Sequence, residues 1–205
     1  MIEVIKARLA AYAPRRLPEG ERPRAAVLLP LYPKDGSLHV VFTKRSEDVR
    51  THKGEVSFPG GAVDEKDPDL IATALREAME EIGLYPDHVV VIGELDEIVT
   101  ISEFHVSVFV GEIAPQAQPY EWRPQELEVA EVLEVPIEHL LDEENLIEVA
   151  RQREGEMMIM EGFSYGDHVI WGATGRMLRN FFDVVFGDEA DRDELAIEQS
   201  QANEA

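Results

Sequence analysis

The chain has 205 residues, a length sufficient for one domain with a substantial hydrophobic core. Forty-two acidic residues outnumber nineteen basic residues, and the formal net charge of −23 disfavours electrostatic binding to nucleic acid or to anionic membranes. Cysteine is absent, which excludes disulfides and thiol chemistry. No apolar run is long enough to span a membrane and the N-terminus lacks the layout of a signal peptide, so we expect a soluble, cytoplasmic protein.

The N-terminal part of the chain predicts a helix followed by two paired strands. Residues 1–12 carry apolar side chains at helical spacing, and a proline-containing, irregular lead-in follows to residue 23. Residues 25–31 and 38–43 predict strands, with Asp35-Gly36 between them as a hairpin turn. The N-terminal helix has an apolar stripe that the domain need not bury by itself, so we expect a homodimer.

Residues 44–53 form a cationic segment in an otherwise strongly acidic chain, containing Lys44, Arg45, Arg50, His52 and Lys53. Such a concentration of positive charge suits a phosphate-rich ligand. The alternative is a surface loop whose charges balance acidic neighbours. The cationic segment leads into the glycine pair Gly60-Gly61, where we expect a turn.

The next stretch predicts a helix with clear boundaries. Asp67 can cap it, Pro68 can occupy its first position, and Gly83 provides a left-handed stop. Its apolar residues recur at helical spacing and can face a core; they are Leu70, Ala74, Leu75, Ala78 and Ile82.

Three carboxylates, Glu77, Glu80 and Glu81, share one face of this helix. Like charges at this spacing destabilise a helix by roughly 0.2–0.5 kcal/mol per pair, and they lie toward its C-terminal end, where the helix dipole disfavours anions. Either solvent or a hard divalent cation can offset this repulsion.

The remainder of the chain predicts further strands and a final helix. Residues 89–95 and 104–113 predict strands, the second with two sides of unequal polarity, and we expect His105 to be a strand residue rather than a ligand. A proline-containing loop then ends near Glu126 and Glu128, either of which can supply a further carboxylate; acids that simply precede a strand are the alternative.

Residues 129–135 and 157–160 predict two more strands, and we expect the methionines of the second to be in the core. Pro136 begins a short helix, and residues 168–171 form a strand that turns into an amphipathic helix. This order suits helices packed on a mixed sheet. We divide the chain into residues 1–23 (helix and lead-in), 24–186 (main domain) and 187–205 (acidic tail expected to be disordered).

Residues 76–84, which read REAMEEIGL, resemble the second half of the Nudix box of the Nudix hydrolases, and Gly61 resembles the leading glycine of that box. The loop between them is slightly longer than in the usual box, and Asp67 stands where the first glutamate of the box would fall. The resemblance implies an α/β fold, the Nudix-type α/β/α sandwich with a mixed β-sheet. It also implies Mg²⁺ or Mn²⁺ bound by helix carboxylates, and as substrate a nucleoside diphosphate linked to another group.

The residues upstream resemble the additional motif of the coenzyme A pyrophosphatases within this family. The positions that match in register are Thr43, Arg45, Ser46, Arg50, Gly54, Phe58, Pro59, Gly60 and Gly61. The resemblance implies hydrolysis of coenzyme A to 3′,5′-ADP and 4′-phosphopantetheine. Two rival hypotheses are a Nudix hydrolase of ADP-ribose, NADH or a nucleoside triphosphate, and a ligand sensor without enzymatic activity.

The resemblance also implies roles for individual residues. Glu77 and Glu81 are the expected metal ligands, Glu80 is a third ligand or the general base, and Glu128 is the additional carboxylate from the later loop. Arg76 orients a carboxylate through its forked guanidinium. Arg45 and Arg50, with Gly60 and Gly61, form the expected substrate-binding set.

Overall fold

The computed structural model describes residues 1–47, 53–117, 119–153 and 156–187. The prediction that Arg50 binds substrate and the prediction of a disordered tail over 188–205 therefore lie outside the described residues. The helices are α1 (Ile2–Ala11), α2 (Leu70–Ile82), α3 (Ile137–Leu141) and α4 (Gly172–Phe186), with short 3₁₀ turns at Pro86–His88, Pro115–Ala117 and Glu143–Asn145. None of the helices in the described ranges is long and apolar enough to cross a bilayer.

The strands form one large mixed sheet and one smaller sheet. The large sheet contains β1 (Arg24–Lys34), β2 (Ser37–Arg45), β3 (Val56–Ser57), β4 (Gly60–Ala62), β5 (Val89–Glu94), β6 (Ile98–Val99), β7 (His105–Ile113) and β8 (Val129–Pro136). The smaller sheet contains β9 (Leu146–Arg153), β10 (Glu156–Tyr165) and β11 (His168–Ile170).

Strand β1 is the centre of the large sheet. Its pairing with β7 is parallel, whereas its pairings with β2 and β4 are antiparallel. Asp35 and Gly36 join β1 to β2 and both have positive φ, of 51° and 84°, as a two-residue hairpin turn requires. Because β1 pairs with β2 through its C-terminal end and with β4 through its N-terminal end, the glycine pair of β4 lies beside the first residues of β1.

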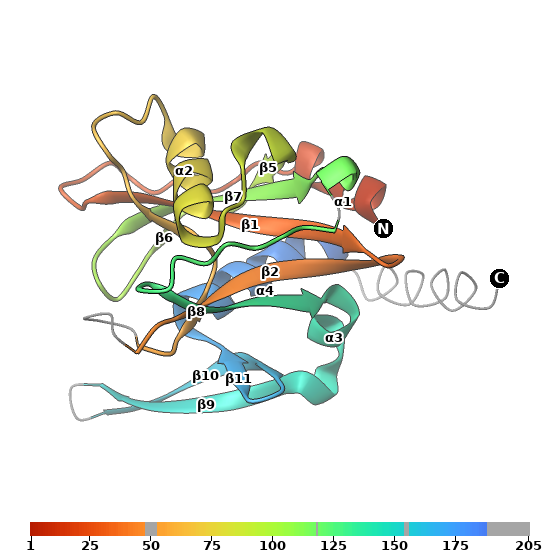
Figure 1. The fold of residues 1–205 in the computed structure, drawn as a ribbon. Coiled ribbons are helices and arrows are strands. Elements are labelled where there is room, and N and C mark those ends of the chain that lie inside the picture. The colour runs from red at the N-terminus through yellow and green to blue at the C-terminus, as the bar shows by residue number, and fades with distance from the viewer. Residues whose placement is uncertain (48–52, 118, 154–155, 188–205) are drawn as a thin grey trace.

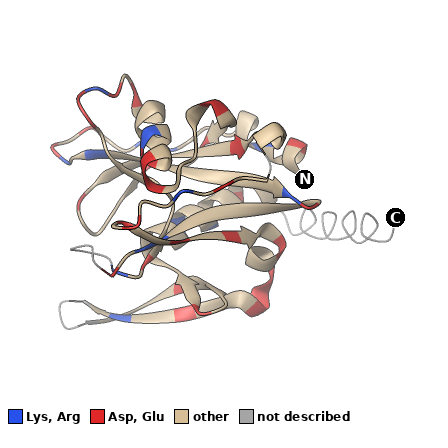
Figure 2. Cartoon of the chain, viewed as in Figure 1, with Lys and Arg blue, Asp and Glu red and all other residues tan. Residues whose placement is uncertain are grey.

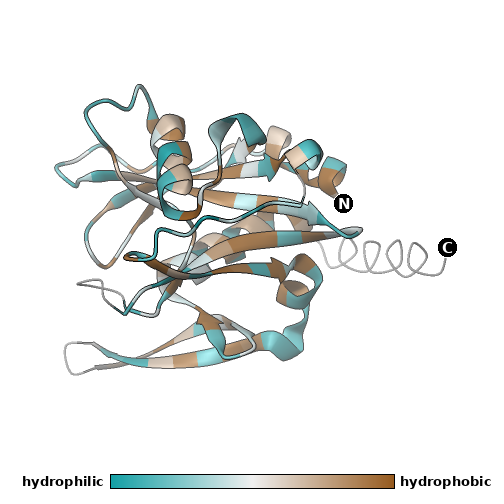
Figure 3. Ribbon diagram, in the orientation of Figure 1, coloured by the Kyte–Doolittle hydropathy of each residue, from teal (hydrophilic) through white to brown (hydrophobic). Residues whose placement is uncertain are grey.

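Helices cover both faces of the large sheet (Figure 1). On one face α2 packs against β1 and β7, and on the other α1 and α4 pack against a larger apolar cluster. The strands between these layers are predominantly hydrophobic (Figure 3). This arrangement confirms the expected α/β/α sandwich with a mixed sheet. All nine residues of strand β7 are buried, so both of its sides, which differ in polarity, lie inside the protein.

The boundaries of α2 differ from the prediction at one end only. Asp69, not Asp67, is the N-cap: its side chain accepts a hydrogen bond from the backbone N–H of Ala72, and Pro68 lies outside the helix. Asp67 is instead engaged by Arg76. At the other end Gly83 has a φ of 71° and ends the helix in the left-handed conformation, as predicted.

Two further predictions about apolar surfaces are wrong. Met157 and Met158 are exposed, because the ends of β9 and β10 extend beyond the helices as a two-stranded ribbon with no layer over it (Figure 1). Ile5 and Leu9 of α1, which seemed available for a partner chain, are buried in the domain's own core. The apolar stripe of α1 therefore does not support a homodimer, which stays a prediction.

Candidate active site

Glycine residues of β4 allow the sheet and the acidic helix α2 to approach each other closely. A Cβ atom on Gly61 would lie 2.5 Å from the Glu77 carboxylate, so no larger residue fits there without displacing that side chain. The backbone of Gly60 hydrogen-bonds the Glu81 carboxylate. Gly60-Gly61 is therefore a short strand rather than the expected turn, and it serves to bring backbone against two of the predicted site carboxylates.

Arg76 organises the N-terminal side of this cluster. Its Nε and Nη2 donate to the two carboxylate oxygens of Asp67, each at 3.0 Å, in the forked geometry of an arginine–carboxylate pair. Its Nη1 donates to Glu77 at 2.8 Å and to Glu80 at 3.0 Å. The paired guanidinium lowers the pKa of Asp67 well below its usual range. Figure 2 shows basic and acidic residues side by side on α2, whereas acidic residues outnumber basic ones in the chain as a whole.

Glu81 is the most unusual carboxylate of the cluster. Only 6% of the residue is exposed, and its Oε2 atom has no hydrogen-bond partner. Burial, reinforced by the negative charge of Glu77, raises its pKa to about 8. Burial also raises the pKa of Glu77, although Arg76 opposes the shift. Glu80 is more exposed and is held at the surface by Arg76.

The loop before β8 carries Glu128 to the same place. The last carbonyl groups of α2 accept hydrogen bonds from this loop: Glu81 O from Gln125 N and Ile82 O from Arg123 N, both at 2.9 Å. The charge of Glu128 accordingly raises the pKa of both Glu77 and Glu81. Of the two acidic candidates in the loop, Glu128 is thus the one brought to the helix carboxylates. The sequence does not predict this anchoring, because the backbone N–H groups of Gln125 and Arg123 make the contacts and any residue type other than proline supplies such a group.

The donor set fits a divalent cation. Hard cations prefer carboxylate oxygens, and here the charges of Glu77 and Glu128 both act on Glu81, whose Oε2 atom is buried and without a partner. Within the described residues no three acidic or histidine side chains stand at ligand spacing, and Arg76 forms ion pairs with both Glu77 and Glu80. A bound cation would compensate for the repulsion among these carboxylates, which solvent cannot do for the buried Glu81.

Arg45 lies close enough to Glu81 for its charge to act on that carboxylate. It is the last residue of β2, where the pairing with β8 is irregular, and its backbone N–H donates to Glu55 O at 3.0 Å. Its positive charge lowers the pKa of Glu81, and its Nε atom is buried without a hydrogen-bond partner. A buried guanidinium N–H without a partner is suited to donate a hydrogen bond to an anionic ligand.

A cavity of about 600 Å³ begins at Arg45 and the glycine pair. This is within the size range of small-molecule sites. Its lining comes from the sheet face opposite α2, the loop between β6 and β7, and the first turns of α4, and comprises Ala25, Val27, Arg45, Glu55, Val56, Ser57, Phe58, Gly60, Gly61, Ala62, Thr100, Ile101, Ser102, Phe104, Val106, Trp171, Gly172, Ala173, Thr174 and Met177.

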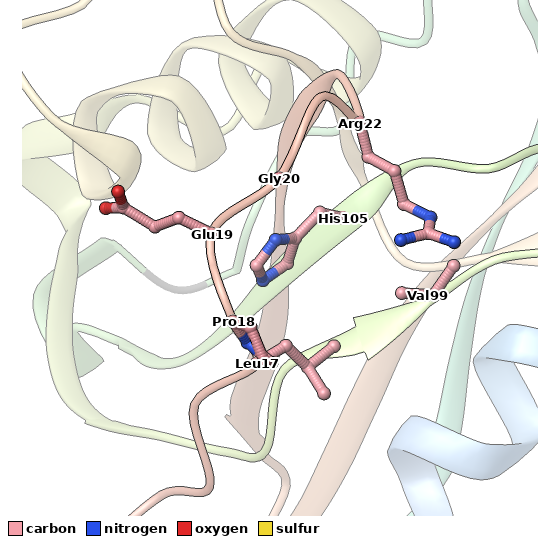
Figure 4. A pocket seen from close by; sticks show the side chains of 7 residues that line it. All are labelled: Leu17, Pro18, Glu19, Gly20, Arg22, Val99 and His105. Carbon is pink, nitrogen blue, oxygen red and sulfur yellow. The ribbon is translucent and has the colours of Figure 1, made fainter.

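A smaller hollow of about 230 Å³ lies under the lead-in, where the His105 ring faces Leu17 and Pro18 (Figure 4). His105 belongs to β7, as predicted, and its Nε2 lies 2.9 Å from the buried carboxylate of Glu97. The same carboxylate accepts from Leu17 N at 2.8 Å and Ser107 Oγ at 3.0 Å. These contacts attach the lead-in to the sheet.

Comparison with known proteins matches residues 21–154 to the model of the NUDIX domain. The chain belongs to the Nudix family. It is 40% identical over 168 residues to Nudix hydrolase 22, chloroplastic, of Arabidopsis thaliana, covering 80% of this chain but only 55% of that protein. It is 36% identical over 169 residues to the uncharacterized Nudix hydrolase NudL of Pectobacterium atrosepticum, covering 80% of this chain and 84% of that one.

The fold agrees with this membership. A crystal structure of a MutT/nudix family protein from Enterococcus faecalis superposes with a TM-score of 0.56, covering 84% of this chain and 65% of that chain at 16% identity. At that identity the likeness concerns the fold alone. Together with the relatives, the domain match makes this protein a Nudix hydrolase, a class that acts on nucleoside diphosphate derivatives and generally requires a divalent metal.

Proposed function

We propose that this Nudix hydrolase cleaves the diphosphate of coenzyme A, giving 3′,5′-ADP and 4′-phosphopantetheine. The observation that carries the proposal is Arg45. It combines a fixed position in the coenzyme A motif with a buried, unpartnered Nε atom beside the acidic cluster. A diphosphate next to the carboxylates of α2 would satisfy that nitrogen.

The other described residues of the motif have visible structural tasks. Thr43 is buried and donates to Ser57 O at 3.2 Å, joining β2 to β3. Gly54 has a φ of 67°, and the Phe58 ring stacks on Phe42 with centroids 4.9 Å apart. These residues build the turn that presents Gly60 and Gly61. The Nε atom of Arg45, by contrast, has no hydrogen-bond partner in the fold, which supports a ligand-binding role for this side chain.

Glu77 and Glu81, with Glu80 and Glu128, would hold the Mg²⁺ or Mn²⁺ ion. When bound, the ion supplies neutralisation of phosphate charge and a lowered pKa of water. Arg76 orients Glu77 and Glu80 through the two contacts of its Nη1. Glu80 is the carboxylate with access to solvent, so it can serve either as a ligand or as the base that takes a proton from water. Arg45, with Arg50 as its expected companion, would hold the substrate phosphates.

The test is a turnover screen with Mg²⁺ and Mn²⁺ over coenzyme A, ADP-ribose, NADH and the nucleoside triphosphates. Coenzyme A is expected to give the highest kcat/KM. Much faster turnover of ADP-ribose would refute the coenzyme A assignment while leaving the Nudix chemistry intact. Lack of metal-dependent turnover on every substrate would favour a ligand sensor.

A further inference from the structure

The large cavity has an unequal distribution of charge along its length. Among the described residues that line it, the charged side chains are Arg45 and Glu55, and the backbone hydrogen bond between them places both at the same end. The other described lining residues are uncharged and include Ile101, Phe104 and Trp171, with hydroxyl groups as the polar component. The charge on the cavity wall is therefore concentrated at Arg45 and Glu55, and the remaining described lining is neutral and largely apolar.

The position of the cavity relates this polarity to the reaction. Its walls include Gly60 and Gly61, and on the other side of Gly61 lies the Glu77 carboxylate. A diphosphate held between Arg45 and the acidic cluster would thus extend one of its two substituents into the cavity. The other substituent would extend away from it.

The two substituents of coenzyme A differ sharply in charge. The adenosine side carries a 3′-phosphate dianion, whereas the pantetheine side is a neutral chain with a dimethyl group and two amides. Burying a phosphate among apolar side chains without a cation is strongly unfavourable. A neutral chain finds apolar contacts there, and its amides find the hydroxyl groups of Thr100, Ser102 and Thr174.

We propose that the cavity between the β6–β7 loop and the start of α4 binds the uncharged pantetheine arm, leaving the phosphorylated nucleoside outside it. This inference rests on the proposed function for the identity of the substrate. Arg151, on β9, is not among the residues that line the cavity, and its guanidinium is engaged by the Trp171 ring, with Cζ 4.2 Å from the ring centroid. This contact holds Trp171 in the cavity wall.

The experiment measures binding of the two products separately, by calorimetry with Mg²⁺ present, so that no turnover is needed. Ile101→Asn removes apolar contact from one wall, and Ile101 is 61% exposed, so the fold does not depend on it. Ala173→Leu fills the cavity from α4. The matched control is Val90→Asn, at an apolar position on β5 that is 57% exposed and outside the cavity lining.

Both cavity variants are expected to weaken 4′-phosphopantetheine binding roughly five- to thirtyfold and to change 3′,5′-ADP binding less than about twofold. The control should change neither. Selective weakening of 3′,5′-ADP would overturn the proposal, because the nucleoside would then occupy the cavity. An unchanged affinity for both products would overturn it as well.

The wild-type protein separates this inference from the proposed function. If it turns over coenzyme A but the cavity variants bind both products normally, the cavity assignment fails and the proposed function stands. If it binds 4′-phosphopantetheine in a manner sensitive to Ile101→Asn but turns over no coenzyme A, the proposed function fails and the cavity assignment stands.

Discussion

Replacing Glu97 with glutamine should destabilise the protein at neutral pH and much less at acid pH. Burial by itself would raise the pKa of this carboxylate, but hydrogen bonds from Leu17 N–H, His105 and Ser107 outweigh it and lower the pKa to about 2 from the ordinary value of 4.5. Since the folded pKa is the lower one, this carboxylate stabilises the folded state above pH 4.5. The contribution is lost as the pH falls toward 2.

The size of the effect follows from the shift. A difference of about 2.5 pH units at about 1.4 kcal/mol each corresponds to roughly 3 kcal/mol at neutral pH. Glu97→Gln should therefore lower the unfolding free energy at pH 7 by about 2–4 kcal/mol. For a chain of this length that corresponds to a melting temperature lower by about 5–15 °C. Near pH 2 the two proteins should be similarly stable.

The assay is urea unfolding of both proteins at pH 7, 4 and 2.5. Glu103→Gln is the matched control, because Glu103 likewise contacts the lead-in, through an ion pair with Arg22, but its side chain is 66% exposed. That control should stay within about 1 kcal/mol of wild type at every pH. If Glu97→Gln and wild type instead lose stability in parallel as the pH falls, the buried carboxylate is not the group that links the lead-in to the sheet.

Three further predictions concern the active site. Glu77→Gln and Glu81→Gln should each abolish most metal-dependent turnover, while circular dichroism shows that the fold is intact. Near-normal rates at saturating Mg²⁺ and Mn²⁺ would show that these residues are not the ligands. Without metal, Glu81→Gln should melt at a higher temperature than wild type at neutral pH, since it removes the cost of burying a carboxyl group that is ionised in the unfolded chain. Metal should stabilise wild type but not the variant. Arg45→Ala and Arg50→Ala should each lower kcat/KM for coenzyme A roughly 10–150-fold, the effect of losing one charge-assisted hydrogen bond. One of the two variants should lose much less activity against dephospho-coenzyme A, which lacks the 3′-phosphate. Equal losses on both substrates would assign both arginines to the diphosphate.

Several features of the molecule were predictable from the sequence because short-range rules govern them. The Asp35-Gly36 hairpin follows from the need for positive φ, and the end of α2 follows from Gly83. Helical spacing alone puts Glu77 and Glu81 one turn apart. The family resemblance rested on these local patterns, and the fold it implied is the one observed.

Other features depended on which segments meet in space. The cap of α2 is Asp69 because Asp67 is pulled away by Arg76, nine residues further along the chain. The exposure of Met157 follows from where the β9–β10 ribbon ends relative to the helices, which a strand pattern does not specify.

The chemistry of the site belongs to this second group. The sequence by itself determined that several carboxylates share a helix face, since periodicity is a local property. Only the tertiary structure decided that Glu81 is the buried one, with a pKa of about 8, and that Glu128 joins it through a loop tied to the end of α2. Burial and the approach of distant charges set a carboxylate's proton affinity, and both arise only when the sheet, the helix and the loop pack together.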